Sequence, residues 1–461
     1  KQVSTTVSRI RALRPKRILE IGCGSGLLLY QLAPDVDTYV AIDFSAAIIE
    51  QLQTHLAADE ALAHVELHTA AADDLHVLGE AQFDTVIINS VVQYFPSAAY
   101  LTDVLEKVLA HVAPNGRIFI GDVRNYDVLN LFHIAVQKQQ VSDDTTAARF
   151  RQTIELNMRQ EQELILSPHY FTQLRDVLSR ITHLDVALKP GFDDNEMTHF
   201  RYDVSLYTDT EVPPTRIDWL DWHQDQVTET AVRQALTAGK QPYVAIANVP
   251  NGRLTTFNTL AQAVAAHDGN TPIGSLTRAD APAVPDPGHM WELAQQHNYD
   301  VKVAWSPNRQ DGAFDVLFTR RSEAELIVPF VEMPLTRATA VDQPVANIPV
   351  QNVSSLEVTR HLRDQLKQTL PDYMIPSTFI VLDALPVNAN GKVDRQALPL
   401  VAHERPLLNS AFVAPGDELQ AQLAQIWSEV LRVERVGIHD NFFELGGDSI
   451  LAIQITMLAG E

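Results

Sequence analysis

Cysteine is nearly absent from this sequence, which has Cys23 as its only one among 461 residues. A single cysteine excludes an internal disulfide framework and fits a reducing compartment, so we expect a cytoplasmic protein. No grouping of cysteine and histidine has the spacing of a zinc site, so we expect no metal. Cys23 lies between two glycines, and we interpret it as a small filler residue rather than a nucleophile.

Basic residues and long apolar runs are also scarce. The 35 Lys and Arg residues face 58 Asp and Glu residues, which leaves a net charge of -23. This balance argues against a nucleic-acid surface and disfavours an anionic membrane. No apolar run approaches membrane-spanning length, and the first residues show no signal-peptide pattern. We therefore expect neither nucleic acid nor membrane as a partner. The length predicts roughly two to four domains.

The densest pattern in the chain is the stretch 17–26, Arg-Ile-Leu-Glu-Ile-Gly-Cys-Gly-Ser-Gly. Its apolar half is typical of a strand that is buried on both faces. Glycine at alternate positions permits positive φ and lets a ligand approach the backbone closely. Asp43 ends a second apolar segment, and an acid at that strand tip is where a Rossmann-like fold holds ribose hydroxyls.

The spacing of the glycines separates two kinds of nucleotide site. A dinucleotide fingerprint is G-x-G-x-x-G, whereas this pattern is E-x-G-x-G-x-G and an acid leads it. An acid beside the loop suits a cationic ligand. The pattern resembles the first motif of class I methyltransferases that use S-adenosylmethionine (SAM). The alternative is a plain strand–turn–helix. The SAM-binding residues that the resemblance implies are Glu20, Gly22, Gly24, Gly26 and Asp43.

Strand and helix patterns alternate from about residue 17 to 210, which predicts a parallel, doubly wound α/β sheet. Two acids, Asp73 and Asp74, follow the third expected strand at 65–68. An acid there can accept a hydrogen bond from an adenine amino group, and we favour Asp73. A solvated helix cap is the alternative. Residues 140–180 are rich in helix formers and charge and are a candidate lid over the site.

Polar residues also follow the fourth expected strand, at 83–89. Asn89, Gln93 and Tyr94 would lie at the carboxyl end of the sheet, where ligands bind in open α/β sheets. A second polar group lies beside a later apolar strand and is either an acceptor-binding site or a charged edge. It comprises Glu196, His199, Arg201 and Tyr202.

The pattern changes between about residues 211 and 330. Tryptophans and proline breaks appear, and residues 243–250 and 314–318 resemble strands. We interpret this region as a second α/β portion attached to the first. A proline-containing linker is predicted next, at 331–354, and an amphipathic helix at 355–370.

Two long segments near the C-terminus carry a second resemblance, namely Leu-Pro-Asp-Tyr-Met-Ile-Pro at 370–376 and Pro-Val-Asn-Ala-Asn-Gly-Lys-Val-Asp-Arg at 386–395. By itself the Asn-Gly pair would predict a hairpin turn with Lys392 on the surface. Together the segments resemble the last two motifs of the adenylation domain of a nonribosomal peptide synthetase. The resemblance implies that Lys392 reaches the ATP phosphates and the substrate carboxylate, where a cation offsets developing negative charge.

A third resemblance follows at 440–450, Asp-Asn-Phe-Phe-Glu-Leu-Gly-Gly-Asp-Ser-Ile. It is similar to the attachment motif of a peptidyl carrier domain and implies that Ser449 carries 4′-phosphopantetheine. The two glycines break the chain, and Ser449 begins an expected helix whose N-terminus favours a phosphate. A simple helix cap at Ser449 is the alternative.

The order of these parts resembles synthetase modules in which an N-methyltransferase is inserted late in the adenylation domain. Residues 89–96 and 201–204 also resemble motifs of those inserted domains. The fold class expected is a Rossmann-like α/β methyltransferase with an appended α/β portion, a small α+β adenylation C-terminal subdomain and a partial helical carrier. The predicted domains are 1–330 (core 1–210, appended portion 211–330), a linker at 331–354, the adenylation segment 355–398, a linker at 399–414 and the partial carrier 415–461.

The resemblance implies SAM-dependent methylation of the α-amine of an aminoacyl thioester on a carrier. Glu196, His199 or Tyr94 would take or orient the proton, and Asn89 or Gln93 would hold the amine or the thioester carbonyl. The expected partners are a loaded carrier, the remainder of the adenylation domain and neighbouring synthetase domains. No Ser/Thr/Gly-rich phosphate loop is present, so we expect ATP and magnesium to act only in a complete adenylation domain. Methylation at oxygen or carbon, and a silent scaffold, are the alternatives.

Overall fold

The structure is a computed structural model in which the described residues are 2–57, 59–210, 217–276, 284–307, 310–321, 333–334, 344–350, 366, 414–431, 436–440, 455 and 459. The chain divides into two units, residues 1–350 and residues 351–461. In the second unit, helix α15 (Glu418–Leu431) packs Trp427 and Leu431 against Val436. Lys392, Ser449 and the predicted adenylation segment 355–398 (Leu366 apart) lie outside the described residues.

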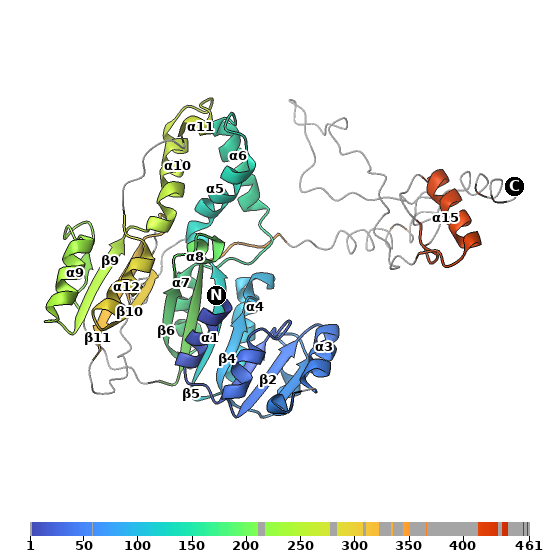
Figure 1. Cartoon of the computed structure of the whole chain (residues 1–461), viewed down its shortest axis with the longest axis horizontal. Helices are drawn as coiled ribbons and strands as arrows, with labels where there is room; N and C mark the ends of the chain where they lie inside the picture. Colours follow the sequence, from blue (N-terminus) through green and yellow to red (C-terminus); the bar gives the residue numbers. More distant parts are fainter. Residues whose placement is uncertain are drawn as a thin grey trace. The chain divides into compact units, whose positions relative to one another are not determined.

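The larger sheet of the first unit contains seven strands within the described ranges, in the order β3-β2-β1-β4-β5-β7-β6 (Figure 1). Its strands are β1 (Arg17–Ile21), β2 (Thr38–Asp43), β3 (Val65–Thr69), β4 (Phe83–Asn89), β5 (Val112–Arg124), β6 (Ile181–Leu188) and β7 (Arg201–Thr208). The helices of the unit are α1 (Gln2–Ala12), α2 (Leu29–Leu32), α3 (Ala46–Leu56), α4 (Ala98–Leu109), α5 (Leu129–Gln140), α6 (Ala147–Arg159), α7 (Pro168–Val177), α8 (Glu196–Phe200), α9 (Glu229–Ala238), α10 (Thr255–Ala266), α11 (Ile273–Leu276) and α12 (Pro287–Gln296).

Strands β1 to β5 run parallel, with β1 between β2 and β4, as the alternating pattern predicts. Strand β7 differs, because it runs antiparallel to both β5 and β6. The prediction of a parallel sheet is therefore wrong for this strand. A parallel return needs a crossover that recrosses the sheet. The connection at 189–200 contains only the five-residue α8, so the chain turns back beside β6.

Alternate side chains of β1 face opposite sides of the sheet, as strand geometry requires. Ile18 packs in a cluster with side chains of α1 and α3, and Leu19 packs in another with side chains of α4, α5 and α7. Leu105 of α4 has no exposed surface, and burying a side chain of this size contributes about 1.5–3 kcal/mol. Burial on both faces explains why the strands read as continuous apolar runs.

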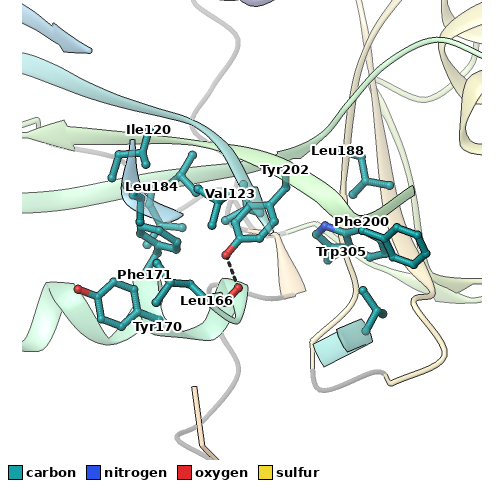
Figure 2. Packing of buried hydrophobic residues seen from close by; sticks show 14 of the residues in the cluster. Ile120, Val123, Leu166, Tyr170, Phe171, Leu184, Leu188, Phe200, Tyr202 and Trp305 are labelled. Carbon is teal, nitrogen blue, oxygen red and sulfur yellow. Dashed lines mark hydrogen bonds between the residues drawn. The ribbon is translucent and has the colours of Figure 1, made fainter. Parts of the chain in front are cut away.

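The region predicted as a lid contains two helices with different positions. Helix α6 contacts α5, whereas α7 contacts β6 and buries Phe171 in the main core. Figure 2 shows Phe171 and Tyr202 in one layer, where the Tyr202 hydroxyl donates to the Leu166 carbonyl at 2.8 Å. Because α7 covers the sheet, the lid prediction is wrong for residues 168–177.

The appended portion forms a second sheet in the order β10-β11-β9-β8. Its strands are β8 (Leu220–Asp221), β9 (Tyr243–Val249), β10 (Tyr299–Trp305) and β11 (Phe314–Arg320). Strand β10 contacts β6, and Lys302 pairs with Asp185 across that contact at 2.8 Å. Helix α10 contacts α5. The two sheets share one hydrophobic cluster, so the appended portion is built onto the methyltransferase core.

Residues 344–350, inside the predicted linker, run along residues 161–167 of the core. Ala346 pairs with Leu166 in an antiparallel bridge. The Asn347 side chain accepts from the backbone N–H of Ile165 and donates to the carbonyl of Glu163, both at 2.8 Å. This part of the chain is therefore tied to the methyltransferase unit by side-chain and backbone hydrogen bonds.

Candidate active site

The glycine-rich loop begins directly after β1. Gly22 has a φ of 75°, and a Cβ there would lie 2.4 Å from Cγ2 of Val91, so only glycine fits without a shift. Gly24 has a φ of 48°, but a Cβ at this position would meet no atom within 4 Å. The loop therefore packs tightly against the protein at Gly22 and borders open space at Gly24, where a ligand could approach the backbone.

Asp43 ends β2 and fixes this loop. Its two carboxylate oxygens accept from the backbone N–H of Gly24 at 3.0 Å and of Ser45 at 2.9 Å. Phe44, the next residue, is 82% exposed, and Leu27, directly after the loop, is 62% exposed. Asp43 itself is only 6% exposed, so the accessible surface at this strand end is apolar. The contact of Asp43 with a ribose stays a prediction.

Glu20 lies on β1 within the sheet and is only 3% exposed. It accepts a hydrogen bond of 2.7 Å from the hydroxyl of Tyr39 on β2. Burial raises the pKa of Glu20 from 4.5 to about 7, although the Tyr39 hydrogen bond lowers it. Tyr39 was not singled out from the sequence, because only the β1–β2 register brings the two side chains together. A cationic ligand near this carboxyl would favour its ionised form.

The structure distinguishes the two acids after β3. The side chain of Asp73 is hydrogen-bonded by the hydroxyl of Tyr100, and burial together with this bond raises the pKa of Tyr100 to about 12. Asp74 instead pairs with the exposed His76 at 2.5 Å. Asp73 therefore has a defined place beside α4, and its role as adenine acceptor stays a prediction.

The polar residues after β4 have different environments. The Asn89 amide nitrogen donates to the Ser90 hydroxyl oxygen at 3.1 Å. Gln93 is buried, and its amide donates to the Ser90 carbonyl at 3.0 Å. Tyr94 is 76% exposed. Asn89 is the last residue of β4, and Gln93 and Tyr94 follow it, in agreement with the expected position at the edge of the sheet. Of the three, Tyr94 offers by far the largest accessible surface.

The second polar group, predicted beside the later strand, does not form one cluster. Two of its members pair near the surface, and the other two are buried. Asn195 caps α8 by accepting from the backbone N–H of Thr198 at 3.2 Å, and this cap fixes the start of the helix at Glu196. Glu196 pairs with Arg201 at 2.6 Å. His199 is buried, and burial lowers its pKa. The fourth member, Tyr202, belongs to the core layer described above.

Residues that the sequence left without a role connect the two polar groups. Asp122, in β5, accepts from the Ser90 hydroxyl at 2.6 Å, and its own carbonyl accepts from Arg201 at 3.4 Å. Lys189, directly after β6, forms an ion pair with the Asp122 carboxylate. In the sequence, the only signal for Asp122 is its position directly after the mostly apolar run 118–121, and Lys189 has no such signal. A series of polar contacts through Ser90, Asp122 and Arg201 therefore connects Asn89 with Glu196.

Comparison with known families agrees with this architecture. Residues 19–118 match the family model of a methyltransferase domain, and residues 421–460 match that of a phosphopantetheine attachment site. The second match includes the position of Ser449. The predictions of a methyltransferase and of a phosphopantetheine attachment region are confirmed.

Curated relatives match nearly the whole chain. Chondramide synthase cmdD of Chondromyces crocatus is 37% identical over 463 residues, which is 98% of this chain and 12% of the relative. Cyclosporin synthetase simA of Tolypocladium inflatum is 31% identical over 475 residues, which is 96% of this chain and 3% of the relative. Enniatin synthase of Fusarium equiseti is 29% identical over 471 residues, 96% of this chain and 15% of the relative. The chain is homologous to nonribosomal peptide synthetases.

These synthetases are far longer than the chain, which spans 15% or less of each of the three relatives. Among solved structures, the N-methyltransferase NodS of Bradyrhizobium japonicum WM9 in complex with S-adenosyl-L-homocysteine matches with a TM-score of 0.32 at 13% identity, covering 44% of this chain and 86% of its own. In the described ranges, no helix is long and apolar enough to cross a membrane. The same residues contain no group of three His, Cys, Asp or Glu side chains arranged to hold a metal ion.

Proposed function

We propose that this chain methylates the α-amine of an aminoacyl group that is held as a thioester on the phosphopantetheine arm of a carrier domain. The observation that carries the proposal is the presence of two family matches in one chain, a methyltransferase domain and a phosphopantetheine attachment site. The resemblance of residues 89–96 and 201–204 to motifs of inserted N-methyltransferases supports nitrogen as the acceptor atom.

The residues that would hold SAM are the glycine loop, Asp43, Asp73 and Glu20. Bound SAM supplies an electrophilic methyl group on a sulfonium. The loop contributes open space at Gly24, while the carboxyl groups favour a ligand that carries positive charge. Because Asp43 already accepts two backbone N–H bonds, its geometry is set before a ligand arrives, and this preorganisation reduces the cost of binding.

The chain must also receive the acceptor amine in its neutral form. An α-amino group titrates near pH ~8, so only a mild proton acceptor is needed. His199 fits that task, because burial lowers its pKa and keeps the imidazole neutral at physiological pH. Glu196 carries a charge that Arg201 compensates, so we assign it the orientation of the amine rather than strong-base chemistry. We also propose that Tyr94 helps to take or orient the proton and that Gln93 helps to hold the amine or the thioester carbonyl.

The match to a phosphopantetheine attachment site supports the role of Ser449, whereas the role of Lys392 rests on resemblance alone. We propose Ser449 as the attachment point of 4′-phosphopantetheine and Lys392 as the lysine that a complete adenylation domain would use with ATP and magnesium. A loaded carrier and neighbouring synthetase domains are the proposed partners.

The test is the mass of the aminoacyl group ejected from a phosphopantetheinylated, aminoacyl-loaded carrier after incubation with the chain and SAM. A gain of one methyl group, mapped to the amine by fragmentation, is the expected result. A methyl group mapped to oxygen or carbon would refute N-methylation and keep the methyltransferase. No gain of mass together with no SAM binding in calorimetry would refute the enzymatic proposal.

Variants test the assignment of residues. Glu196→Gln and Tyr94→Phe are expected to lower turnover while SAM binding is retained. Glu229→Gln is the matched control, because Glu229 also pairs with an arginine, Arg233 at 3.3 Å, but lies on α9 of the appended portion. Unchanged turnover in both site variants would show that these residues were wrongly assigned.

A further inference from the structure

A short chain of hydrogen bonds joins the ends of β4 and β5. The Ser90 hydroxyl donates to a carboxylate oxygen of Asp122 at 2.6 Å, and the Asn89 amide nitrogen lies 3.1 Å from the Ser90 oxygen. A serine hydroxyl has one proton, and an ionised carboxylate can only accept. The Ser90 oxygen must therefore accept from Asn89, and the orientation of the Asn89 amide follows from the charge on Asp122.

The Asp122 carboxylate pairs with Lys189 and belongs to a cluster of charges from several elements. Lys189 pairs with Asp122 and with Asp203 of β7, and Arg9 of α1 pairs with Asp203 as well. The backbone N–H of Asp122 also donates to Asp203 at 3.1 Å. Two carboxylates and two cations balance in this cluster, so it brings no net charge into the fold. The cluster thereby fixes the acceptor for the Ser90 hydroxyl.

The backbone at this place is unusual as well. Ser90, directly after β4, has a φ of 58°, and Asp122 of the neighbouring β5 has a φ of 64°. Residues other than glycine rarely adopt this left-handed conformation, and it persists where surrounding contacts hold it. Gly121 provides the space next to it, since a Cβ there would lie 2.0 Å from the Asn89 carbonyl oxygen.

The oriented amide leaves one donor available. The Asn89 oxygen is buried against Gly121, and one amide N–H points to Ser90. An asparagine amide has two N–H donors. Within the described residues, the second amide N–H of Asn89 makes no hydrogen bond. Asn89 is half-buried and lies at the carboxyl edge of the sheet. A donor at this edge matches the carbonyl oxygen of a thioester.

We propose that Ser90 and Asp122 are positioning residues, which hold the Asn89 amide so that its free N–H binds the thioester carbonyl of the acceptor. This inference rests on the proposed function. It gives a role to Ser90, Asp122 and Lys189, which have none in the proposed SAM site or in phosphopantetheine attachment. It also predicts that loss of the Ser90 hydroxyl impairs methyl transfer without weakening SAM binding.

Two variants of Ser90 separate the hydroxyl from the backbone. Ser90→Ala and Ser90→Gly both remove the hydroxyl, but glycine adopts a positive φ without strain. The matched control is Ser306→Ala in the appended portion, because the Ser306 hydroxyl makes a comparable 2.5 Å bond to the buried Asp315. Turnover, KM for the loaded carrier and Kd for SAM are measured for the four proteins.

Both Ser90 variants are expected to lose turnover or carrier affinity on the order of 10- to 100-fold, with an unchanged Kd for SAM, since misplaced contacts cost about this much. Ser306→Ala should lower stability only. Wild-type kinetics in Ser90→Gly would overturn the proposal, even if Ser90→Ala fails to fold. Absence of methylation by the wild-type chain would instead refute the proposed function, so the two failures are distinguishable.

Discussion

Glu20→Gln is expected to stabilise the ligand-free chain, and by more at pH 8 than at pH 5. The carboxyl of Glu20 is buried, accepts from Tyr39 and has a pKa raised by burial from 4.5 to about 7. Between these two values the folded chain keeps a proton that the unfolded chain has released. The stability that the neutral carboxyl provides is therefore complete below pH 4.5 and is lost as the pH rises through about 7.

The magnitude follows from the size of the shift. One pKa unit corresponds to about 1.36 kcal/mol. Relative to a side chain that does not titrate, the raised pKa of Glu20 therefore lowers the free energy of unfolding by about 3 kcal/mol at pH 8 and about 1 kcal/mol at pH 5. A glutamine does not titrate, but its carbonyl oxygen can still accept from Tyr39. The advantage of Glu20→Gln over the wild type is thus expected to grow by about 2 kcal/mol between the two pH values.

The assay is urea unfolding at pH 5 and pH 8 without SAM, followed by circular dichroism. Glu50→Gln is the matched control, because Glu50 is exposed on α3 of the same unit. Tyr39→Phe removes a hydrogen bond that lowers the pKa of Glu20, so it should move the pH dependence to higher pH. If Glu20→Gln and the wild type differ by the same amount at both pH values, Glu20 is not the titrating group and this reasoning is refuted.

Three further predictions concern other contacts. Gly121→Ala places a methyl group 2.0 Å from the Asn89 oxygen, so turnover should fall while calorimetry finds SAM affinity unchanged; normal turnover would contradict this. Glu161→Gln removes one of two carboxylates paired with the buried Arg124 and should cost about 2 kcal/mol in urea unfolding, less than the ~3–5 of a pair broken completely. Asn347→Ala removes two hydrogen bonds to the core and should cost about 1–2 kcal/mol, and an unchanged unfolding midpoint would argue against that contact.

Local patterns were sufficient to locate the residues of the proposed SAM-binding half of the site. The loop from Gly22 to Gly26 and the acid at Asp43 lie at the ends of neighbouring strands, and both strand and turn signals are short-range. The structure agrees, because Gly24 and Asp43 are hydrogen-bonded. The sequence also indicated that polar residues follow β4, since apolar runs show where a strand ends.

The proposed acceptor side depends on contacts between distant residues. Ser90 and Asp122 are 32 positions apart, and Lys189 and Arg9 join the same cluster from other elements. No periodicity relates such residues, because their proximity depends on strand order and on the direction of β7. That direction was predicted wrongly, since a short α8 and a long crossover helix are difficult to distinguish before the sheet is known.

The sequence by itself thus determined the Rossmann-like core, the glycine-rich loop and the carrier motif, because each depends on residues that are close together in the chain. Only the tertiary structure decided that Glu20 is buried against Tyr39, that Tyr202 belongs to the core, and that Asp122 accepts a hydrogen bond from Ser90. The physical reason is that burial and ion pairing depend on what packs around a side chain. Those neighbours come from strands that are adjacent in the sheet but distant in the chain.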